Sequence, residues 1–369
     1  MQNSPSLSCV ANSLTPTSSD AQGESVIFTV QVGDLRARVT LTKSSKLSFT
    51  LDAGTTVMVR EPQDIIDVSP GIRYKFDSYD PSANVTMTEA KTITLVYKTQ
   101  YYLTVTTPHG TTSGEGWFDK GATAKAGVNP LTVAGPPGVQ YVFTGWSGNA
   151  SGTTSPSDPI TMDGPKTAIA NWKTQYLVTF AQAGLDDSAI GTVVTVDGSA
   201  KAYGDLPFSK WVDKDGSVSY AYESVVSSST SGKRFSQESA TRPTSPITVN
   251  DSVKVIGNYK TQYQITFDQT GVEADFTGTI LTIDNKGYML PESFWWDSGT
   301  THTFAFQSPL VVTPNAKKYV CSFVRSTTGL SPDQSSSISV SKSGSVTGNY
   351  KTQYELTMAT NFGTTSLTA

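Results

Sequence analysis

Apolar and polar residues alternate along short stretches of this chain, with the period of two that half-buried β-strands show. In one such stretch Val26, Phe28 and Val30 share one face, and Thr29 and Gln31 share the other. Gly, Pro, Ser and Asn interrupt the alternation about every 8–12 residues, as they do in β-sandwiches and barrels. No window carries the apolar spacing and caps of an amphipathic helix. The pattern predicts an all-β fold.

One five-residue sequence, here called the signature, occurs four times. Its copies begin at Tyr97, Trp172, Tyr259 and Tyr350, and each continues as Lys-Thr-Gln-Tyr. The starts lie 75, 87 and 91 residues apart. Spacings of this length indicate one small folding unit copied in tandem.

The signature sets the expected domain boundaries. We expect a disordered leader at residues 1–23, four β modules (repeats 1 to 4) at 24–98, 99–173, 174–260 and 261–351, and an orphan strand with a tail at 352–369. The predicted fold class is therefore a tandem array of four small β-sandwich or Ig-like modules, followed by a C-terminal orphan strand.

The repeats align at a second position, an Asp-x-Gly turn that follows an aromatic or apolar strand. It begins at Asp52, Asp119 and Asp297, and one residue longer at Asp213, which starts Asp213-Lys214-Asp215-Gly216. Asp accepts local backbone N–H bonds and Gly adopts positive φ, so the motif is typical of a tight turn.

The signature itself is predicted to be a strand with two different faces. We expect its first residue to pack in the core or at a junction (Tyr97, Trp172, Tyr259 and Tyr350), while the following lysines face water (Lys98, Lys173, Lys260 and Lys351). Gln100 is expected on the same outward face as Lys98. No Gly/Pro linker separates neighbouring repeats, so the joints should be short and stiff.

Composition restricts the class of protein. Charged residues are only 16% of the chain, the formal net charge is −4, and neither sign is gathered in blocks. A nucleic-acid partner is therefore not expected, and no apolar run is long enough for a membrane span. The polar N-terminus lacks a signal-peptide core, so either the chain is intracellular or its signal lies outside this sequence; we favour the second. Cys9 and Cys321 lie in different parts of the chain, and no disulfide framework is predicted.

Catalytic and metal motifs were sought, and we expect no enzyme. His109 and His302 lie in different repeats, and no serine sits in a nucleophile-elbow motif. Asp213 and Asp215 resemble the start of a calcium loop, but its twelfth position lacks the acidic ligand. They are weak calcium candidates, and a structural turn is the preferred interpretation. No other cofactor is expected.

Three sequons make Asn84, Asn149 and Asn250 candidate glycosylation sites, although chance alone predicts about this many in so Ser/Thr-rich a chain.

Repeat 2 carries three motifs that point to a family: residues 114–121 (GEGWFDKG), 141–148 (YVFTGWSG) and 160–166 (ITMDGPK). Together they resemble the divergent internalin-type B-repeat, a small all-β module of bacterial and archaeal surface proteins that include tandem Ig-like arrays. Residues 191–197 and 278–284 parallel each other in repeats 3 and 4, which look like longer relatives without the Phe-x-Gly-Trp-Ser-Gly core. The resemblance implies a surface location and a spacer, adhesion or filament role, and it transfers no catalytic residue.

Two hypotheses of function follow. The first is a non-enzymatic extracellular structural protein, namely a cell-surface stalk, an adhesin segment or a filament subunit. Its partners would be copies of itself or other surface proteins, joined through a strand donated by Tyr354, Leu356 and Met358 or continued in a longer protein. The second is a carbohydrate-binding accessory region of a larger secreted enzyme, with Trp146 and Trp295 presenting rings to glycans.

Overall fold

The computed structural model describes residues 6–11, 25–42, 46–238, 243–327 and 333–359. Its regular structure there is β-strand, apart from one 3-10 turn at Tyr203–Asp205, so the predicted all-β class is confirmed. Contacts group the chain into two compact units, residues 1–175 and 176–369, rather than into four. The signature still marks four sets of sheets, which we continue to call repeats 1 to 4.

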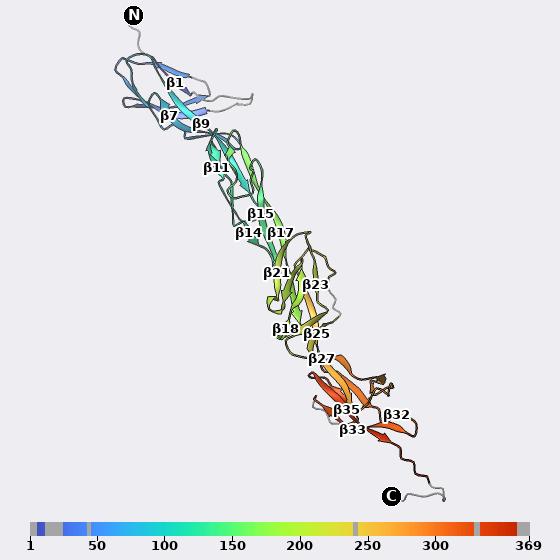
Figure 1. The fold of residues 1–369 in the computed structure, drawn as a ribbon. Helices are drawn as coiled ribbons and strands as arrows, with labels where there is room; N and C mark the ends of the chain where they lie inside the picture. The colour runs from blue at the N-terminus through green and yellow to red at the C-terminus, as the bar shows by residue number, and fades with distance from the viewer. Residues whose placement is uncertain (1–5, 12–24, 43–45, 239–242, 328–332, 360–369) are drawn as a thin grey trace. The chain divides into compact units, whose positions relative to one another are not determined.

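Repeat 1 packs two sheets around one core (Figure 1). One sheet has the order β4-β1-β9-β7-β6, formed by β4 (Lys46–Thr50), β1 (Ser6–Ala11), β9 (Lys91–Thr106), β7 (Ile72–Asp80) and β6 (Ile65–Ser69). The facing sheet has the order β3-β2-β5-β8, formed by β3 (Leu35–Thr42), β2 (Ser25–Val32), β5 (Thr56–Arg60) and β8 (Asn84–Thr86). The alternating residues Val26, Phe28 and Val30 are buried between the sheets, as the period of two requires.

The range expected to be a disordered leader contains β1. Residues Ser6–Ala11 pair antiparallel with β4 and parallel with β9. The other residues of 1–23 lie outside the described part of the chain. The leader is therefore not wholly without structure.

Repeat 2 completes the first unit and shares β9 with repeat 1. The second half of β9 pairs antiparallel with β11 (Gly116–Asp119) and parallel with β17 (Lys166–Ala183). Side chains of β15 (Val139–Gly148) hydrogen-bond to β17, and β14 (Thr132–Ala134) pairs with β15. Two short pairs cover the core: β10 (Thr111–Ser113) with β13 (Gly127–Asn129), and β12 (Thr123–Ala124) with β16 (Ile160–Thr161).

In the second unit, repeat 3 is built around the end of β17 and β27 (Val253–Thr270), which pair in parallel. Antiparallel neighbours extend this sheet through β25 (Lys233–Gln237), β24 (Val225–Ser228) and β18 (Ala189–Ile190), with β21 (Phe208–Asp213) beside β17. Two further sheets complete repeat 3. One has the order β20-β19-β23, formed by β20 (Ser199–Ala202), β19 (Thr192–Val196) and β23 (Tyr220–Tyr222). The other is a short pair of β22 (Ser217–Val218) and β26 (Ile247–Thr248).

Repeat 4 repeats the arrangement of repeat 1. Its first sheet has the order β30-β27-β35-β33-β32, formed with β30 (Glu292–Asp297), β35 (Gly344–Tyr354), β33 (Lys317–Ser326) and β32 (Leu310–Thr313). The facing sheet has the order β29-β28-β31-β34, formed by β29 (Lys286–Tyr288), β28 (Leu281–Ile283), β31 (Thr301–Phe306) and β34 (Ser335–Ser339).

Each long signature strand serves two repeats. Its first half is the closing strand of one repeat, and its second half is the leading strand of the next, as β9 and β27 show (Figure 1). No loop intervenes, because a single continuous strand carries the chain from one sheet to the next. Backbone hydrogen bonds on both halves oppose bending at the joint.

The predicted Asp-x-Gly motif forms a turn in each repeat. Gly54, Gly121 and Gly299 have φ between 83° and 87°, and their N–H groups donate to Met87, Met162 and Val340. In the longer third turn Asp215 takes the positive φ (63°) and donates to Val249. The turn thus fastens the end of one strand to the core.

The predicted faces of the signature hold apart from Lys173, which is half-buried, and one more important exception. Tyr97, Tyr259 and Tyr350 are buried, and their hydroxyls donate to backbone carbonyls of Gln63, Glu223 and Gln307 at 2.7, 2.9 and 2.9 Å. Burial raises the pKa of the Tyr97 and Tyr350 hydroxyls. Trp172 and Lys173 are half-buried, while the other three signature lysines are exposed. The exception is Gln100, which is only 8% exposed and does not face water.

Candidate functional site at the joints between repeats

The joint between repeats 1 and 2, within the first unit, is tied by a cluster centred on Gln100. The amide oxygen of Gln100 accepts a hydrogen bond from Arg73 Nε at 2.8 Å, and its Nε2 donates to Asp119 Oδ1, also at 2.8 Å. The Arg73 guanidinium lies over the Trp117 ring, 4.3 Å from its centroid. Arg73 belongs to repeat 1, and Asp119 and Trp117 belong to repeat 2. We call this arrangement the glutamine clamp.

The same clamp recurs between repeats 3 and 4, within the second unit. Arg234 Nε donates to Gln262 Oε1 at 2.8 Å, and Gln262 Nε2 donates to Asp297 Oδ1 at 2.8 Å. The Arg234 guanidinium lies 4.4 Å from the centroid of Trp295. Burial lowers the pKa of Arg234. Four residue types thus take the same geometry twice, at equivalent positions of the repeat.

A backbone contact accompanies each clamp. The N–H of Tyr102, two residues after Gln100, donates to Gly71 in the β6–β7 turn at 3.0 Å. The N–H of Gln264, two residues after Gln262, donates to Gly232 in the β24–β25 turn at 2.9 Å. In the second unit Ser343 Oγ also donates to the Ser231 carbonyl at 3.2 Å. The turn of one repeat therefore rests on the leading strand of the next.

The physical role of the clamp follows from its burial and saturation. The glutamine amide presents an oxygen acceptor and an NH2 donor group in one plane, and each of these two groups makes a hydrogen bond across the joint. The arginine adds a cation–π contact, which is strongest where water is excluded. Rotation of one repeat against the next would break these bonds together, so the clamp resists bending and twisting at the joint.

Sequence reasoning missed the clamp because strand parity placed Gln100 on the outward face. At the joint that face is covered by the next repeat, so the rule for a free sheet does not apply. A usable signal was present, because glutamine occupies the fourth position of every signature copy although the residue after the final tyrosine varies. Arg73 and Trp117 gave no comparable signal, since they lie in separate strands.

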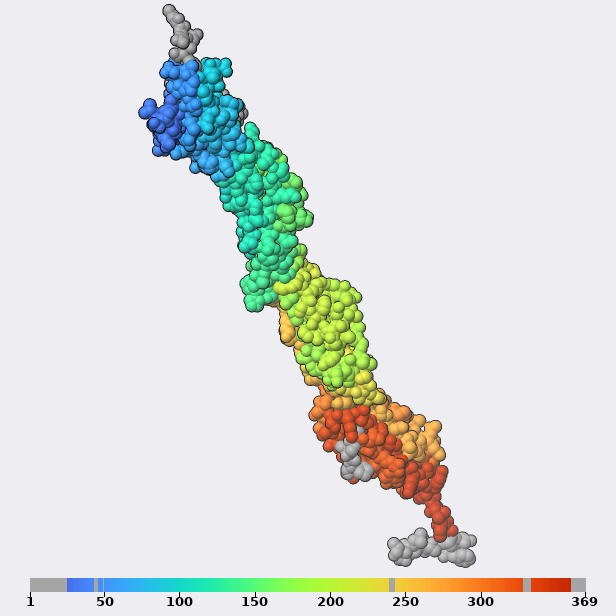
Figure 2. Space-filling view, turned by 90° about the vertical axis from the view of Figure 1, so that its left-hand side faces the viewer, coloured from blue at the N-terminus to red at the C-terminus, as the bar shows by residue number. Residues whose placement is uncertain are grey.

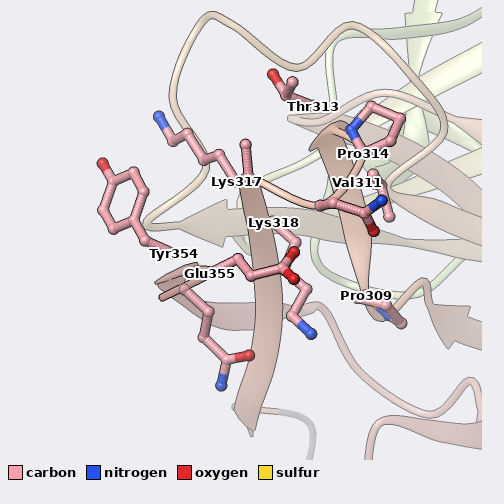
Figure 3. Close-up of a pocket in the computed structure, with 11 residues that line it drawn as sticks. Pro309, Val311, Thr313, Pro314, Lys317, Lys318, Tyr354 and Glu355 are labelled. Atoms are coloured by element: carbon pink, nitrogen blue, oxygen red, sulfur yellow. The ribbon is translucent and has the colours of Figure 1, made fainter. Parts of the chain in front are cut away.

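The other two signature copies differ at this position. Gln175 accepts a hydrogen bond from Gln140 Nε2 at 2.7 Å, so a glutamine stands where repeats 1 and 3 have arginine. Gln353 is exposed and pairs in register with Lys318. Gln353 and Lys318 line an open hollow together with Tyr354, Glu355, Val311 and Pro309 (Figure 3). The fourth copy is half of a clamp.

The first of the strand-donor candidates, Tyr354, lines this hollow. Tyr354 ends β35 and pairs with Lys317, and the N–H of Glu355 donates to Ala316 at 3.0 Å. Tyr354, Leu356 and Met358 are 73%, 83% and 68% exposed. Figure 2 shows the last described residues as a narrow extension from the body of repeat 4.

The calcium candidates are parts of a turn. Asp213 ends β21, and Asp215 holds the positive φ of the third Asp-x-Gly motif. Within the described residues, no group of three or more His, Cys, Asp or Glu side chains is placed to hold a metal ion. Calcium binding by Asp213 and Asp215 stays a prediction.

The glycosylation candidates Asn84, Asn149 and Asn250 are all exposed. Asn84 begins β8, and the Asn149 side chain accepts a hydrogen bond from the Thr167 N–H at 2.9 Å. Their modification is untested by the structure.

The two histidines are structural rather than isolated on loops. His109 stacks on Tyr141 with ring centroids 3.7 Å apart. His302 stacks on Trp296 at 3.9 Å, and its Nδ1 lies 2.7 Å from the carboxylate of Asp284. The hydrogen bond with His302 lowers the pKa of Asp284. Both histidines therefore pack against aromatic side chains.

The two tryptophans proposed for glycan binding are occupied by internal contacts. Trp146 is buried in the core of repeat 2, and its Nε1 donates to the Thr154 carbonyl at 2.9 Å. Trp295 is half-buried beneath Arg234 in the second clamp. Burial of Trp146 leaves it little surface for a sugar, and Arg234 lies over one face of the Trp295 ring.

Comparisons with known proteins find distant likenesses only. No family model and no curated protein matches the chain. Among solved structures, the Bacillus anthracis TIE protein aligns at 8% sequence identity with a TM-score of 0.21, covering 89% of this chain and 68% of that one. The pilus adhesin SpaC from Lactobacillus rhamnosus GG, in its open conformation, aligns at 12% identity with a TM-score of 0.17, covering 96% of this chain and 44% of that one. Scores this low carry no argument about function.

The predicted B-repeat resemblance therefore stays a prediction. Among the described residues, no helix has the length and hydropathy of a membrane span.

Proposed function

We propose that this chain is a non-enzymatic structural protein of the cell surface: a stalk, an adhesin segment or a filament subunit. In this proposal the four repeats are β-sandwich modules of Ig-like type, set in series. The repeats keep a fixed spacing along the chain, and their partners are surface proteins or copies of the chain itself. An extracellular location fits the hydroxyl-rich, weakly charged composition and the exposed sequons.

The recurrence of the glutamine clamp is the observation that carries the proposal. Two joints use the same Arg-Gln-Asp-Trp set, although the surrounding repeats differ in length and sequence. A chain of independent binding modules needs only a tether between them, whereas a load-transmitting chain needs joints of fixed geometry. Continuous strands and saturated clamps serve the second purpose.

Pulling a single molecule by its two termini tests the proposal. A structural role predicts that the chain keeps its folded extension as force rises and then lengthens in discrete steps, each the unfolding of a compact unit. Gradual lengthening at low force, without discrete steps, would show that the repeats are loosely tethered and would refute a stalk.

A further inference from the structure

Residues 354–358 match the leading strand of the other repeats position by position. After the signature tyrosine, repeats 2, 3 and 4 carry the buried apolar pairs Leu103 and Val105, Val178 and Phe180, and Ile265 and Phe267. The equivalent pair after Tyr354 is Leu356 and Met358, which are 83% and 68% exposed. This segment therefore has the sequence of a leading strand, and its apolar side chains are exposed.

Repeat 1 offers a place of the same kind, which β1 occupies. Leu7 of β1 pairs in parallel with Lys91 of β9, just as Leu103 pairs in parallel with Lys166 of β17. On the other side β1 pairs antiparallel with β4, as the leading strand of repeat 2 pairs with β11. By this register Leu7 and Cys9 stand where the other repeats have their buried apolar pair. Cys9 is the smallest residue at its position.

Repeats 4 and 1 also carry complementary halves of a clamp. Gln353 and Lys318 pair in register at the C-terminal edge of repeat 4, where the two clamped joints have Gln and Arg. Asp52 begins the Asp-x-Gly turn of repeat 1 and is equivalent to Asp119 and Asp297, which accept hydrogen bonds from the clamp glutamines. Asp52 is exposed.

We propose that residues 354–358 of one copy replace β1 in repeat 1 of a second copy, joining the two head to tail. Leu356 would pair with Lys91 in parallel and with Phe49 antiparallel, the register that Leu7 has now. Gln353 Nε2 would donate to Asp52, and the Lys318 cation would lie beside that carboxylate. The inference rests on the filament form of the proposed function and names the partner as this same chain.

The expected joint is weaker than the internal ones. The position of Trp117 and Trp295 is held by Thr50 in repeat 1, so the cation–π contact is lost. The resident β1 belongs to the same molecule and competes at the millimolar effective concentration typical of short tethers. Assembly should therefore be reversible and should grow with protein concentration.

Disulfide trapping tests the register directly. Ser8 pairs with Ser48, and Thr357 is equivalent to Ser8, so Ser48→Cys combined with Thr357→Cys should crosslink neighbouring copies. The background carries Cys9→Ala and Cys321→Ala, and the matched control pairs Thr357→Cys with Thr40→Cys, an exposed residue in the other sheet of repeat 1. Mild oxidation of the full chain should give a ladder of covalent oligomers with Ser48→Cys and monomer with Thr40→Cys.

A second variant checks that the apolar pair drives the exchange. Leu356→Ser with Met358→Ser removes side chains that are already exposed, so the fold is not at risk. The ladder should fall by roughly tenfold or more, because two buried side chains are lost from the joint. Monomer in every variant, an internally crosslinked monomer, equal ladders in both cysteine pairs, or a ladder unchanged by the serine variant would each overturn the proposal. None of these outcomes alters the result of the pulling experiment, which tests the stalk separately.

Discussion

At the scale of the residue, the clamp glutamine is the most informative side chain in the molecule. Gln100 is buried with both amide groups bonded, and Gln262 repeats its contacts. The net gain of a satisfied hydrogen bond is modest, but its removal leaves half-buried partners without theirs, which costs more. Gln353, the equivalent glutamine of the fourth signature copy, is exposed and can therefore serve as an internal control for Gln100.

Gln100→Ala should lower the free energy of unfolding of the first unit by about 1–3 kcal/mol, because Arg73 and Asp119 lose their common partner. Urea denaturation followed by tryptophan fluorescence measures this. Gln353→Ala is the matched control and should leave stability unchanged, because that side chain is exposed. Equal losses of stability in the two variants would show that the clamp does not stabilise the joint.

Acid sensitivity is also set by single residues. The hydrogen bond from Lys233 Nζ, 2.5 Å from Asp186 Oδ2, holds the pKa of that carboxyl below its ordinary 3.8, with a further contribution from Ser188. A carboxyl whose pKa is lower in the folded than in the unfolded chain adds stability at a pH above the unfolded value. That stability disappears as the pH falls through the folded value.

Asp186→Asn should therefore destabilise the second unit by up to about 1 kcal/mol at neutral pH, the scale of a partly exposed ion pair. The difference from wild type should vanish in acid, below the folded pKa. Urea denaturation across a pH series measures it, and exposed Asp187→Asn is the neighbouring control. A difference that persists in acid would mean that packing, rather than charge, explains the loss.

At the scale of the element, much of the fold was predictable. Period-two alternation predicted the strands, and the Asp-x-Gly motif predicted turns that the positive φ of Gly54, Gly121 and Gly299 bears out. The buried face of the signature also followed from parity, because Leu103 and Val105 are core residues. These properties depend on local sequence alone.

Other elements could not be predicted because their cause is not local. β1 carries only a degenerate leading-strand sequence, and its place is given by edges of β4 and β9 that lie far along the chain. The clamp joins three separate strands, so no single stretch encodes it. Parity failed at Gln100 because a second repeat covers the face that a free sheet would leave to water.

Gly271 tests the close approach of a leading strand to the closing strand of its repeat. Its φ is +88°, and an added Cβ would lie 2.1 Å from the Tyr350 carbonyl oxygen. Gly299 has a φ of +87° with nothing within 4 Å, so it isolates the cost of backbone conformation. Gly299→Ala should cost about 1–2 kcal/mol. Gly271→Ala should cost about 1–3 kcal/mol more, because the strands must separate.

Thermal unfolding of the two glycine variants provides the measurement. Similar losses for both would show that the approach at Gly271 relaxes freely and that the two strands are not fixed against each other.

At the scale of the whole molecule, four sequence repeats fold as two compact units. Within each unit the repeats share a continuous strand and a clamp. The number of independent domains stays a prediction. We infer that the clamp, together with the continuous strand, fixes the geometry of the joint.

Electron-spin distance measurement across the first joint tests that claim most directly. Spin labels at Thr40→Cys in repeat 1 and Lys125→Cys in repeat 2, both exposed sites, are introduced with Cys9 and Cys321 replaced by alanine. If the clamp fixes the joint, the distances between the labels should form a single narrow distribution. This distribution should broaden when Arg73→Ala and Gln100→Ala are combined, and it should be unchanged by Gln353→Ala. A distribution that is already broad with the clamp intact, or equally narrow without it, would show that the clamp does not fix the joint.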